Sequence, residues 1–432
     1  MRKNKIDIIS LGCSKNLVDS EHLIKQLEVA GYTVEHNPSK VNGEIVVVNT
    51  CGFIQDAQEE SVNMILELGQ AKRQGKIRKL FVMGCLSERF MADLIKELPE
   101  VDKFYGKFSW TSLLNDLGKA YDQSLCTERT LTTPSQYAYL KISEGCNRFC
   151  AFCAIPLITG RHKSVPMEQI LQEVRNLGAK GVKEFNVIAQ DLSYYGVDID
   201  GKMLLPELID HMAQITGVEW IRLHYAYPTQ FPYELLPVMA RHENVCKYLD
   251  IALQHINNNV LSNMRRHITA KETIELIKRI RKEVPGIHIR TTLMVGFPGE
   301  TDEAFEELKQ FVKSMRFERM GAFAYSEETG TYAEQHYADE IPQETKSERL
   351  DTLMRIQEQI ATEINESKIG SVMKVVIDRE EESHYVGRTE FDSPEVDPEV
   401  LIEKTTTLNL GEFYKVKITD AMPFELIGEV LQ

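Results

Sequence analysis

Three cysteines lie close together in the segment GCNRFCAFC, where Cys146, Cys150 and Cys153 have the spacing C-x3-C-x2-C. They supply three thiolate ligands, whereas an iron–sulfur cluster of four irons normally takes four, so one iron would stay open. A closed zinc site would need a fourth Cys or His nearby, but the nearest histidine, His162, follows nine residues later. The spacing therefore predicts an iron–sulfur cluster with one open iron. A zinc knuckle or a group of buried structural thiols is the alternative.

Three further cysteines each follow a short apolar run: Cys13 in SLGCSKN, Cys51 in NTCGF and Cys85 in MGCLS. The runs KIDIISLG, EIVVVNT and KLFVMG are typical of buried parallel strands. Ligands in an open parallel sheet bind outside the carboxyl ends of the strands, so we expect the three thiols to converge there on a second cluster. Adjacent helix N-termini should favour the thiolate form. Three buried structural cysteines are the alternative.

The elements that must position these cysteines divide the chain into three predicted domains of an α/β protein. Residues 1–125 alternate strands and helices as a parallel-sheet domain, and a linker covers 126–136. Six strand-like runs in 137–365 alternate with helical stretches, which predicts a partial (β/α)6 barrel with catalytic groups at the carboxyl ends of its strands. Short strand-like runs in 366–432 predict a small antiparallel β-barrel.

The bulk composition excludes several classes of protein. Among 432 residues, 43% are hydrophobic and 27% are charged, as in a globular protein. No stretch approaches the ~18 apolar residues of a membrane span, so we expect a cytoplasmic protein without membrane contact. Eight cysteines in such a chain favour metal binding or catalysis over disulfides. The net charge of −15 argues against broad contact with nucleic acid phosphates.

Together these motifs resemble the methylthiotransferases of the radical S-adenosylmethionine class, whose last module is called TRAM. The resemblance covers nearly the whole chain. Two branches of that family stand out: one modifies transfer RNA adenosine, and the other modifies an aspartate of ribosomal protein uS12. The segment SLGCSKNLVDSEHL is closer to the ribosomal-protein branch, because the RNA branch typically reads nearer to YGCQMN at this place.

The resemblance implies two 4Fe-4S clusters and S-adenosylmethionine as cofactors. The cluster on Cys146, Cys150 and Cys153 would cleave S-adenosylmethionine, and the resulting radical would remove a hydrogen from the β-carbon of the target aspartate. The cluster on Cys13, Cys51 and Cys85 would hold the sulfur to be inserted, and a second S-adenosylmethionine would methylate that sulfur. The electron would come from a low-potential donor such as flavodoxin or ferredoxin.

Three other residues are predicted contacts of S-adenosylmethionine. Phe152, inside the cysteine loop, resembles the aromatic residue that the family places beside the adenine; a core aromatic is the alternative. Gln190 ends the run EFNVIAQ at the catalytic end of the barrel. Gly296 lies in TTLMVGFPGET, which resembles the glycine-rich strand that lines the adenine, but Thr292 stands where the first glycine is usual. Gly296 is then only part of a turn in the alternative interpretation.

Other polar and aromatic residues of the barrel are less specific. Tyr225 and Tyr227 in YAYP are predicted to pack within the barrel. Arg265 and Arg266 either hold the substrate or end a helix with positive charge.

The charge of the last domain favours the ribosomal-protein branch. From Ser367 to Gln432 there are five Lys and two Arg against four Asp and ten Glu, so 7 − 14 gives −7. A module that grips RNA should be basic, whereas this one would repel RNA and attract a basic ribosomal protein. We therefore expect uS12, free or in the small subunit, as the partner, and no nucleic acid contact by this domain. The alternatives are a transfer RNA methylthiotransferase and a non-catalytic iron–sulfur factor in ribosome assembly.

Overall fold

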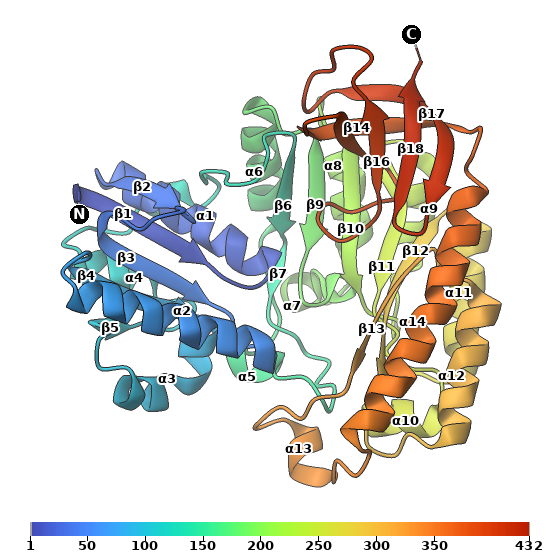
Figure 1. The fold of residues 1–432 in the computed structure, drawn as a ribbon, viewed down its shortest axis with the longest axis horizontal. Helices are drawn as coiled ribbons and strands as arrows, with labels where there is room; N and C mark the ends of the chain where they lie inside the picture. The colour runs from blue at the N-terminus through green and yellow to red at the C-terminus, as the bar shows by residue number, and fades with distance from the viewer. Residues whose placement is uncertain (1, 432) are drawn as a thin grey trace.

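The computed structural model describes residues 2–431, which form three packed parts (Figure 1). An α/β domain comes first, a larger α/β domain lies in the centre, and a β-barrel at the C-terminal end caps the strands of the central domain. Each sheet falls within one predicted segment, while the residue boundaries of the domains stay predictions. Across residues 2–431 no helix is long and apolar enough to cross a membrane.

The first domain is a parallel sheet of five strands in the order β2-β1-β3-β4-β5, with helices on both faces. Its elements are β1 (Arg2–Ser10), α1 (Ser14–Val29), β2 (Thr33–His36), β3 (Gly43–Thr50), α2 (Gln55–Arg73), β4 (Lys79–Gly84), α3 (Cys85–Glu97), β5 (Lys103–Phe104) and α4 (Trp110–Asp116). The three predicted strands are β1, β3 and β4, which are neighbours in the sheet, so this part of the prediction is confirmed. In sheets of this order ligands bind where β1 and β3 diverge to opposite sides.

The central domain is a curved sheet of six parallel strands, in the order β6-β9-β10-β11-β12-β13, with its helices outside (Figure 1). The strands are β6 (Tyr137–Lys141), β9 (Glu184–Ile188), β10 (Trp220–Ala226), β11 (Val245–Ile251), β12 (His288–Val295) and β13 (Arg319–Ala324). The helices are α5 (Ile155–Thr159), α6 (Met167–Ala179), α7 (Val197–Asp200), α8 (Leu205–Ala213), α9 (Leu235–Arg241), α10 (Asn258–Asn263), α11 (Ala270–Glu283), α12 (Asp302–Met315), α13 (Tyr332–His336) and α14 (Gln343–Glu366). A short hairpin of β7 (Ser143–Glu144) and β8 (Lys163–Ser164) flanks the cysteine loop. The edge strands β6 and β13 are not paired with each other, which confirms the predicted partial barrel.

The last domain is a closed barrel in the order β14-β15-β16-β18-β17. Its strands are β14 (Val372–Glu380), β15 (His384–Thr389), β16 (Glu399–Glu403), β17 (Phe413–Met422) and β18 (Glu425–Val430). Four of the five pairings are antiparallel, as predicted, but β16 pairs with β18 in parallel. The chain crosses from β16 to β17 on the far side of β18, so β16 and β18 run in the same direction.

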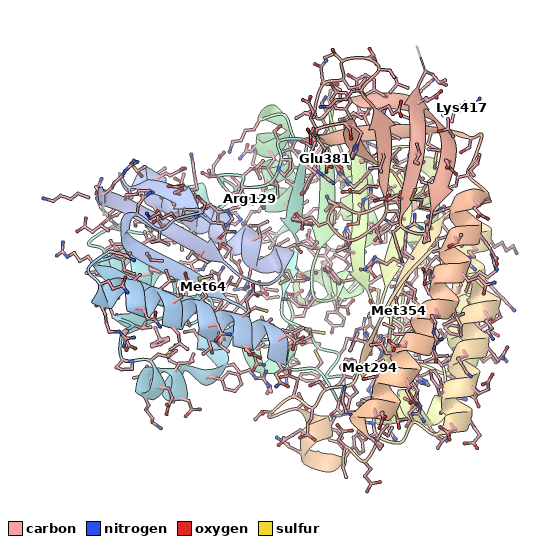
Figure 2. All side chains as sticks on the ribbon, in the orientation of Figure 1. Met64, Arg129, Met294, Met354, Glu381 and Lys417 are labelled. Atoms are coloured by element: carbon pink, nitrogen blue, oxygen red, sulfur yellow. The ribbon has the colours of Figure 1, made fainter. Side chains whose placement is uncertain are left out.

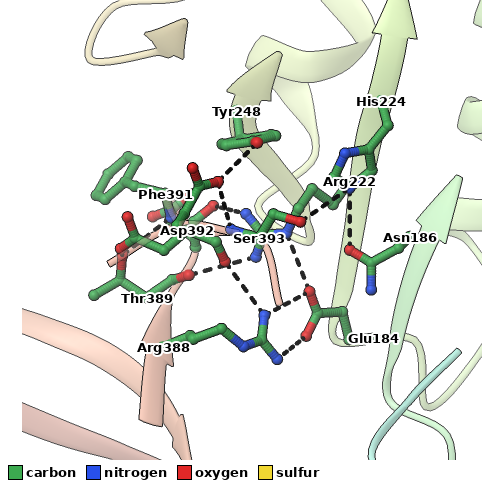
Figure 3. Close-up of polar contacts among 12 residues, drawn as sticks. Glu184, Asn186, Arg222, His224, Tyr248, Arg388, Thr389, Phe391, Asp392 and Ser393 are labelled. Carbon is green, nitrogen blue, oxygen red and sulfur yellow. Dashed lines mark hydrogen bonds and ion pairs between the residues drawn. The ribbon is translucent and has the colours of Figure 1, made fainter. Parts of the chain in front are cut away.

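The loop between β15 and β16, residues 390–398, seals the amino-terminal end of the central strands. Figure 3 shows the buried polar network there, in which Glu184 at the start of β9 binds Arg222 at 3.1 Å and Arg388 at 2.8 Å. Asp392 of the loop forms an ion pair with Arg319 at 2.5 Å. These charges are buried and paired, so this end of the barrel is structural and the opposite end is left for chemistry.

The first domain is attached to the central barrel by buried ion pairs. Arg129, labelled in Figure 2, lies between the two domains and binds Glu21 of α1 at 2.8 Å and Glu173 of α6 at 3.0 Å. Asp19 of α1 pairs with Lys141 of β6 across the domain boundary, and with Lys107 of its own domain at 3.0 Å. Helix α1 therefore packs along β6, and the carboxyl ends of both sheets border the same space.

Candidate active site between two cysteine triads

One cavity of about 320 Å³ is lined by all six predicted cysteines. We call Cys13, Cys51 and Cys85 the strand triad, and Cys146, Cys150 and Cys153 the loop triad. The predicted cofactor contacts Phe152 and Gln190 also line this cavity. The two triads therefore belong to one site, although they come from different domains.

Gly296 is not among the residues that line the cavity. Its backbone N donates to Glu300 Oε2 at 3.0 Å, and a side chain at this position would clash with Lys346 of α14. Its contact with S-adenosylmethionine stays a prediction, and the packing against α14 gives this glycine a structural reason of its own.

The strand triad is built from the ends of three adjacent parallel strands. Cys13 follows β1 and caps α1, Cys51 follows β3, and Cys85 follows β4 as the first residue of α3. Because β1 pairs with β3 and β3 pairs with β4 in parallel, the three carboxyl ends meet at one edge of the sheet. The convergence follows from strand order alone.

Asn16 ties these three strand ends together. Its Nδ2 donates to the carbonyl of Leu11 at 3.2 Å and to that of Thr50 at 2.9 Å, while the Cys85 thiol donates to its Oδ1 at 3.5 Å. The side chain of Asn16 is 1% exposed, so these hydrogen bonds form away from water. One buried amide thus fixes the ends of β1, β3 and β4 relative to one another.

Two glycines allow the ends of the strands to approach closely. Gly12 has φ +87°, and a Cβ built on it would lie 2.8 Å from Cys51 Sγ. A Cβ on Gly52 would lie 2.6 Å from the backbone N of Leu86, directly after Cys85. A larger residue at either position would push the strand triad apart.

The loop triad is local by contrast. The backbone N of Cys153 donates to the carbonyl of Cys150 at 3.1 Å, so the last two cysteines share one turn. The backbone N of Cys146 donates to the carbonyl of Gly160 at 3.2 Å, which closes the loop against the segment that follows α5. The cysteine loop follows the hairpin strand β7 directly after β6, at the carboxyl end of the central sheet, as the sequence predicts.

Burial favours the protonated form of four of the six thiols. It raises the pKa of Cys85 and of Cys146 to about 12, and it also raises the pKa of Cys51 and of Cys153. In the strand triad, the loss of water around Cys51 and Cys85 works against the thiolate form, which adjacent helix N-termini were predicted to favour. Iron must therefore displace protons when it binds.

Each triad has a buried cation beside it. Lys107 lowers the pKa of Cys51 and Cys85 against the stronger effect of burial. Arg266 Nη1 donates to Cys150 Sγ at 3.3 Å and lowers the pKa of Cys153 in the same way. A positive charge next to thiolates offsets the negative charge that a thiolate-bound cluster gathers in a buried site.

The cavity fits iron–sulfur clusters together with a polar ligand. Within residues 2–431, no three Cys, His, Asp or Glu side chains are close enough to hold a single metal ion. Three thiols from each triad line the same cavity, and thiolates are the ligands that iron–sulfur clusters take. Four buried polar atoms on lining residues also have no hydrogen-bond partner: Arg148 Nη2, Gln190 Oε1, Gln254 Oε1 and Arg266 Nε. Buried polar groups normally have a hydrogen-bond partner, so these four atoms are available to a polar ligand.

Sequence reasoning missed several residues of the site. Tyr225 and Tyr227 line the cavity, so their prediction as plain barrel packing is wrong. Gln254 also lines the cavity. The backbone φ angles of Gln254 and Tyr225 are +70° and +65°, values that residues other than glycine rarely adopt. Strain of this kind gathers at functional sites. No pattern in the residue letters signals it, because the surrounding structure imposes it.

The two adjacent arginines separate in the structure. Arg266 lines the cavity at the loop triad, whereas Arg265 lies over the ring of Tyr332 at 4.5 Å from its centroid. Arg148, inside the cysteine loop, also lines the cavity and binds Asp191 at 2.6 Å. Its place between two ligand cysteines was the signal by which the sequence could have identified it.

Protein family models match all three parts of the chain. Residues 140–312 match the Radical SAM superfamily, residues 5–106 match Uncharacterized protein family UPF0004, and residues 369–431 match the TRAM domain. The central barrel with its cysteine loop is therefore that of a radical S-adenosylmethionine enzyme. Proteins of this class carry a 4Fe-4S cluster and use S-adenosylmethionine.

Curated relatives match the chain over its full length. It is 66% identical over 431 residues to "Ribosomal protein uS12 methylthiotransferase RimO" of Parabacteroides distasonis, with 100% of both chains covered. The protein of the same name from Bacteroides fragilis is 64% identical, again over 100% of both chains. The chain belongs to this RimO family, and it is a radical S-adenosylmethionine methylthiotransferase.

Solved structures support the fold. The radical S-adenosylmethionine methyltransferase TsrM of Kitasatospora setae superposes with a TM-score of 0.56 at 13% identity, over 74% of this chain and 72% of that one. The cobalamin-dependent S-adenosylmethionine radical enzyme OxsB gives a TM-score of 0.53 at 12% identity, over 82% of this chain and 56% of that one. At such identities the likeness concerns the fold alone.

Proposed function

We propose that this protein inserts a methylthio group at the β-carbon of an aspartate in ribosomal protein uS12. Membership of the RimO family supports the reaction and the protein substrate. The observation that carries the proposal is that both cysteine triads line one cavity. A methylthio group must be assembled and delivered to the same carbon that loses a hydrogen, so the two chemistries need one shared space.

The loop triad would hold one 4Fe-4S cluster and the strand triad a second. When bound, the clusters and S-adenosylmethionine supply hydrogen abstraction and sulfur transfer, chemistry that no side chain provides. The chain supplies ligands, charge and position. Phe152 and Gln190 border the loop triad as contacts for S-adenosylmethionine, and the free Oε1 of Gln190 is an acceptor for one of its donor groups.

Gln190 is held in place by a partly buried carboxylate. Its Nε2 donates to Glu144 Oε1, and Glu144 in turn binds Lys141 at 2.7 Å. The bond to Glu144 orients the amide with its oxygen directed away from that carboxylate. This orientation leaves the Oε1 atom as an acceptor for the cofactor.

The charge of the last domain supports a basic protein partner, with one correction. The net charge of −7 overstates the field outside the domain, because Asp392 and Asp397 pair with Arg319 and Arg290 of the central barrel. The turn between β14 and β15 still carries exposed acids, among them Glu381, which is labelled in Figure 2. We infer that uS12, free or in the small subunit, meets this protein in the cytoplasm, and that a low-potential donor such as flavodoxin or ferredoxin provides the electron.

The test is product analysis by mass spectrometry. The protein is loaded with iron and sulfide without oxygen, then incubated with S-adenosylmethionine, a reductant and purified uS12. A mass gain of one CH2S unit on an aspartate supports the proposal, and transfer RNA in a parallel reaction is the control substrate. Modified adenosine without modified uS12 would assign the chain to the RNA reaction. Failure to cleave S-adenosylmethionine at all would favour a non-catalytic assembly factor.

A further inference from the structure

Four cationic side chains line the cavity, and three of them have partners. Lys107 binds Asp19 at 3.0 Å, Arg148 binds Asp191 at 2.6 Å, and Arg266 donates to Cys150 Sγ at 3.3 Å. The fourth is Lys15. Among residues 2–431 no carboxylate oxygen lies within 4.0 Å of its Nζ, and no hydrogen-bond acceptor contacts it.

Lys15 is nevertheless nearly buried, with 9% of the residue exposed. It lies in the first turn of α1, two residues after Cys13, and its Nζ sits 3.5 Å from the centroid of the Tyr225 ring. A cation–π contact offsets only part of the cost of removing an ammonium group from water. The contact with Tyr225 orients the ammonium group without neutralising it, so the charge can bind an anion.

Tyr225 holds this charge in the cavity that both triads line. It belongs to β10 of the central domain, while Lys15 belongs to the first domain, so the contact bridges the two domains. Two residues beyond Tyr225, the hydroxyl of Tyr227 lies 3.6 Å from Cys150 Sγ. The positive φ of Tyr225 is a strained conformation for an aromatic residue, and here it holds the ring against Lys15.

We propose that Lys15 binds the carboxylate of the substrate aspartate and makes the enzyme specific for a carboxylate side chain. This inference rests on the proposed function. The reacting β-carbon of aspartate is bonded directly to the carboxyl carbon, so a residue that fixes the carboxylate also fixes the reacting atom. The buried carboxyl of Asp250 is coupled electrostatically to Lys15 but lies beyond 4.0 Å, so the ammonium group stays available to a ligand.

The test compares two forms of uS12, one with the modified aspartate and one with asparagine at that position. Asparagine has the same shape and the same β-carbon but carries no charge. Wild-type enzyme, Lys15→Met, Lys15→Arg and the control Lys25→Met are loaded to equal iron content and assayed for methylthiolated product. Lys25 lies on the same helix but does not line the cavity, so its substitution removes one positive charge without touching the site.

The expected result is a loss of discrimination. Wild type and Lys25→Met should prefer the aspartate form by on the order of 100-fold in kcat/KM, as for other buried charge pairs. In Lys15→Met this ratio should fall at least tenfold, while formation of 5′-deoxyadenosine without uS12 and the KM for S-adenosylmethionine stay unchanged. If Lys15→Met modifies neither form, restored activity in Lys15→Arg on the aspartate form supports the charge.

Three results would overturn the inference: an unchanged ratio in Lys15→Met, no rescue by Lys15→Arg when Lys15→Met is inactive, or a raised KM for S-adenosylmethionine. The last result would assign Lys15 to the carboxylate of the cofactor. Failure of the proposed function is a separate outcome, because wild-type enzyme would then give no product on the aspartate form of uS12.

Discussion

The two cysteine triads reach the same cavity by opposite routes. The loop triad comes from one short stretch of chain whose backbone hydrogen bonds are local, whereas the strand triad comes from three separate strands that meet only when the sheet has formed. Both have a buried cation beside the sulfurs, Lys107 in one and Arg266 in the other. The electrostatic requirement is shared, but one site depends on spacing and the other on topology.

Removal of one cysteine from each triad should have the largest effect on activity. We expect Cys150→Ala to abolish both cleavage of S-adenosylmethionine and modification of uS12. We expect Cys13→Ala to abolish modification yet keep cleavage, because the loop triad stays complete. Each variant should fall from about eight irons per chain to about four. The measurements are iron content, 5′-deoxyadenosine and product mass.

The division of labour between the triads would be wrong if both variants lost cleavage equally. Cys246→Ala is the matched control, since that cysteine is buried inside β11 among hydrophobic side chains and does not line the cavity. It should keep both clusters and both activities.

A second pair of variants tests whether topology or spacing holds each triad. Asn16→Ala removes the amide that joins three strand ends and leaves two backbone carbonyls without their donor. We expect it to cost about 1–3 kcal/mol of unfolding free energy and most of the iron of the strand triad. Asn147→Ala removes only the acceptor for the backbone N of His162, at 3.2 Å, and should keep the iron of the loop triad. Urea unfolding and iron analysis measure both effects.

The comparison of iron loss in the two variants tests whether topology holds only the strand triad. Equal iron loss in Asn16→Ala and Asn147→Ala would show that the loop triad also depends on a single side chain, and the contrast between the sites would disappear.

We expect the affinity of both triads for iron to change with pH in the same direction. Burial raises the pKa of Cys85 and of Cys146 to about 12, so both thiols carry protons at pH 7. Iron replaces these protons, so affinity for iron rises with pH, about tenfold per unit for each proton released. Loading in competition with a chelator at pH 7, 8 and 9, in Cys13→Ala and in Cys150→Ala, measures each triad separately. An iron affinity that fell as the pH rose would contradict the predicted release of protons.

The smallest expected effect comes from the cations. Lys107→Met should weaken iron retention severalfold at the strand triad alone, and Arg266→Met should do so at the loop triad alone, because each cation offsets the charge of its own sulfurs. Asp19 still pairs with Lys141 when Lys107 is replaced, so the fold should survive. Chelator challenge of the single-triad variants gives the rates. Loss at the opposite triad would show that the charges act across the whole cavity.

The sequence was informative where chemistry follows from spacing or strand pattern. The loop triad could be predicted from three letters, and the strand triad from apolar runs that each end on a cysteine. Lys15 and Gln254 could not, because their importance arises from a cross-domain contact and from a positive φ that only the packed structure imposes. The parallel pairing of β16 with β18 was missed for a similar reason: strand pattern predicts a strand but not its neighbour.

The buried ion pairs at the amino-terminal end of the central strands make the central barrel depend on the last domain. Asp392 and Arg388 of the last domain form ion pairs with Arg319 and Glu184 of the central barrel. Cutting the chain after α14 would therefore remove the partners of one positive and one negative charge. Under a transplanted barrel without these partners, each charge left buried and unpaired would cost about 3–5 kcal/mol. The C-terminal barrel therefore cannot simply be exchanged for the barrel of another protein. A transplant from another member of the superfamily would have to bring its own acidic loop, or the recipient would not fold.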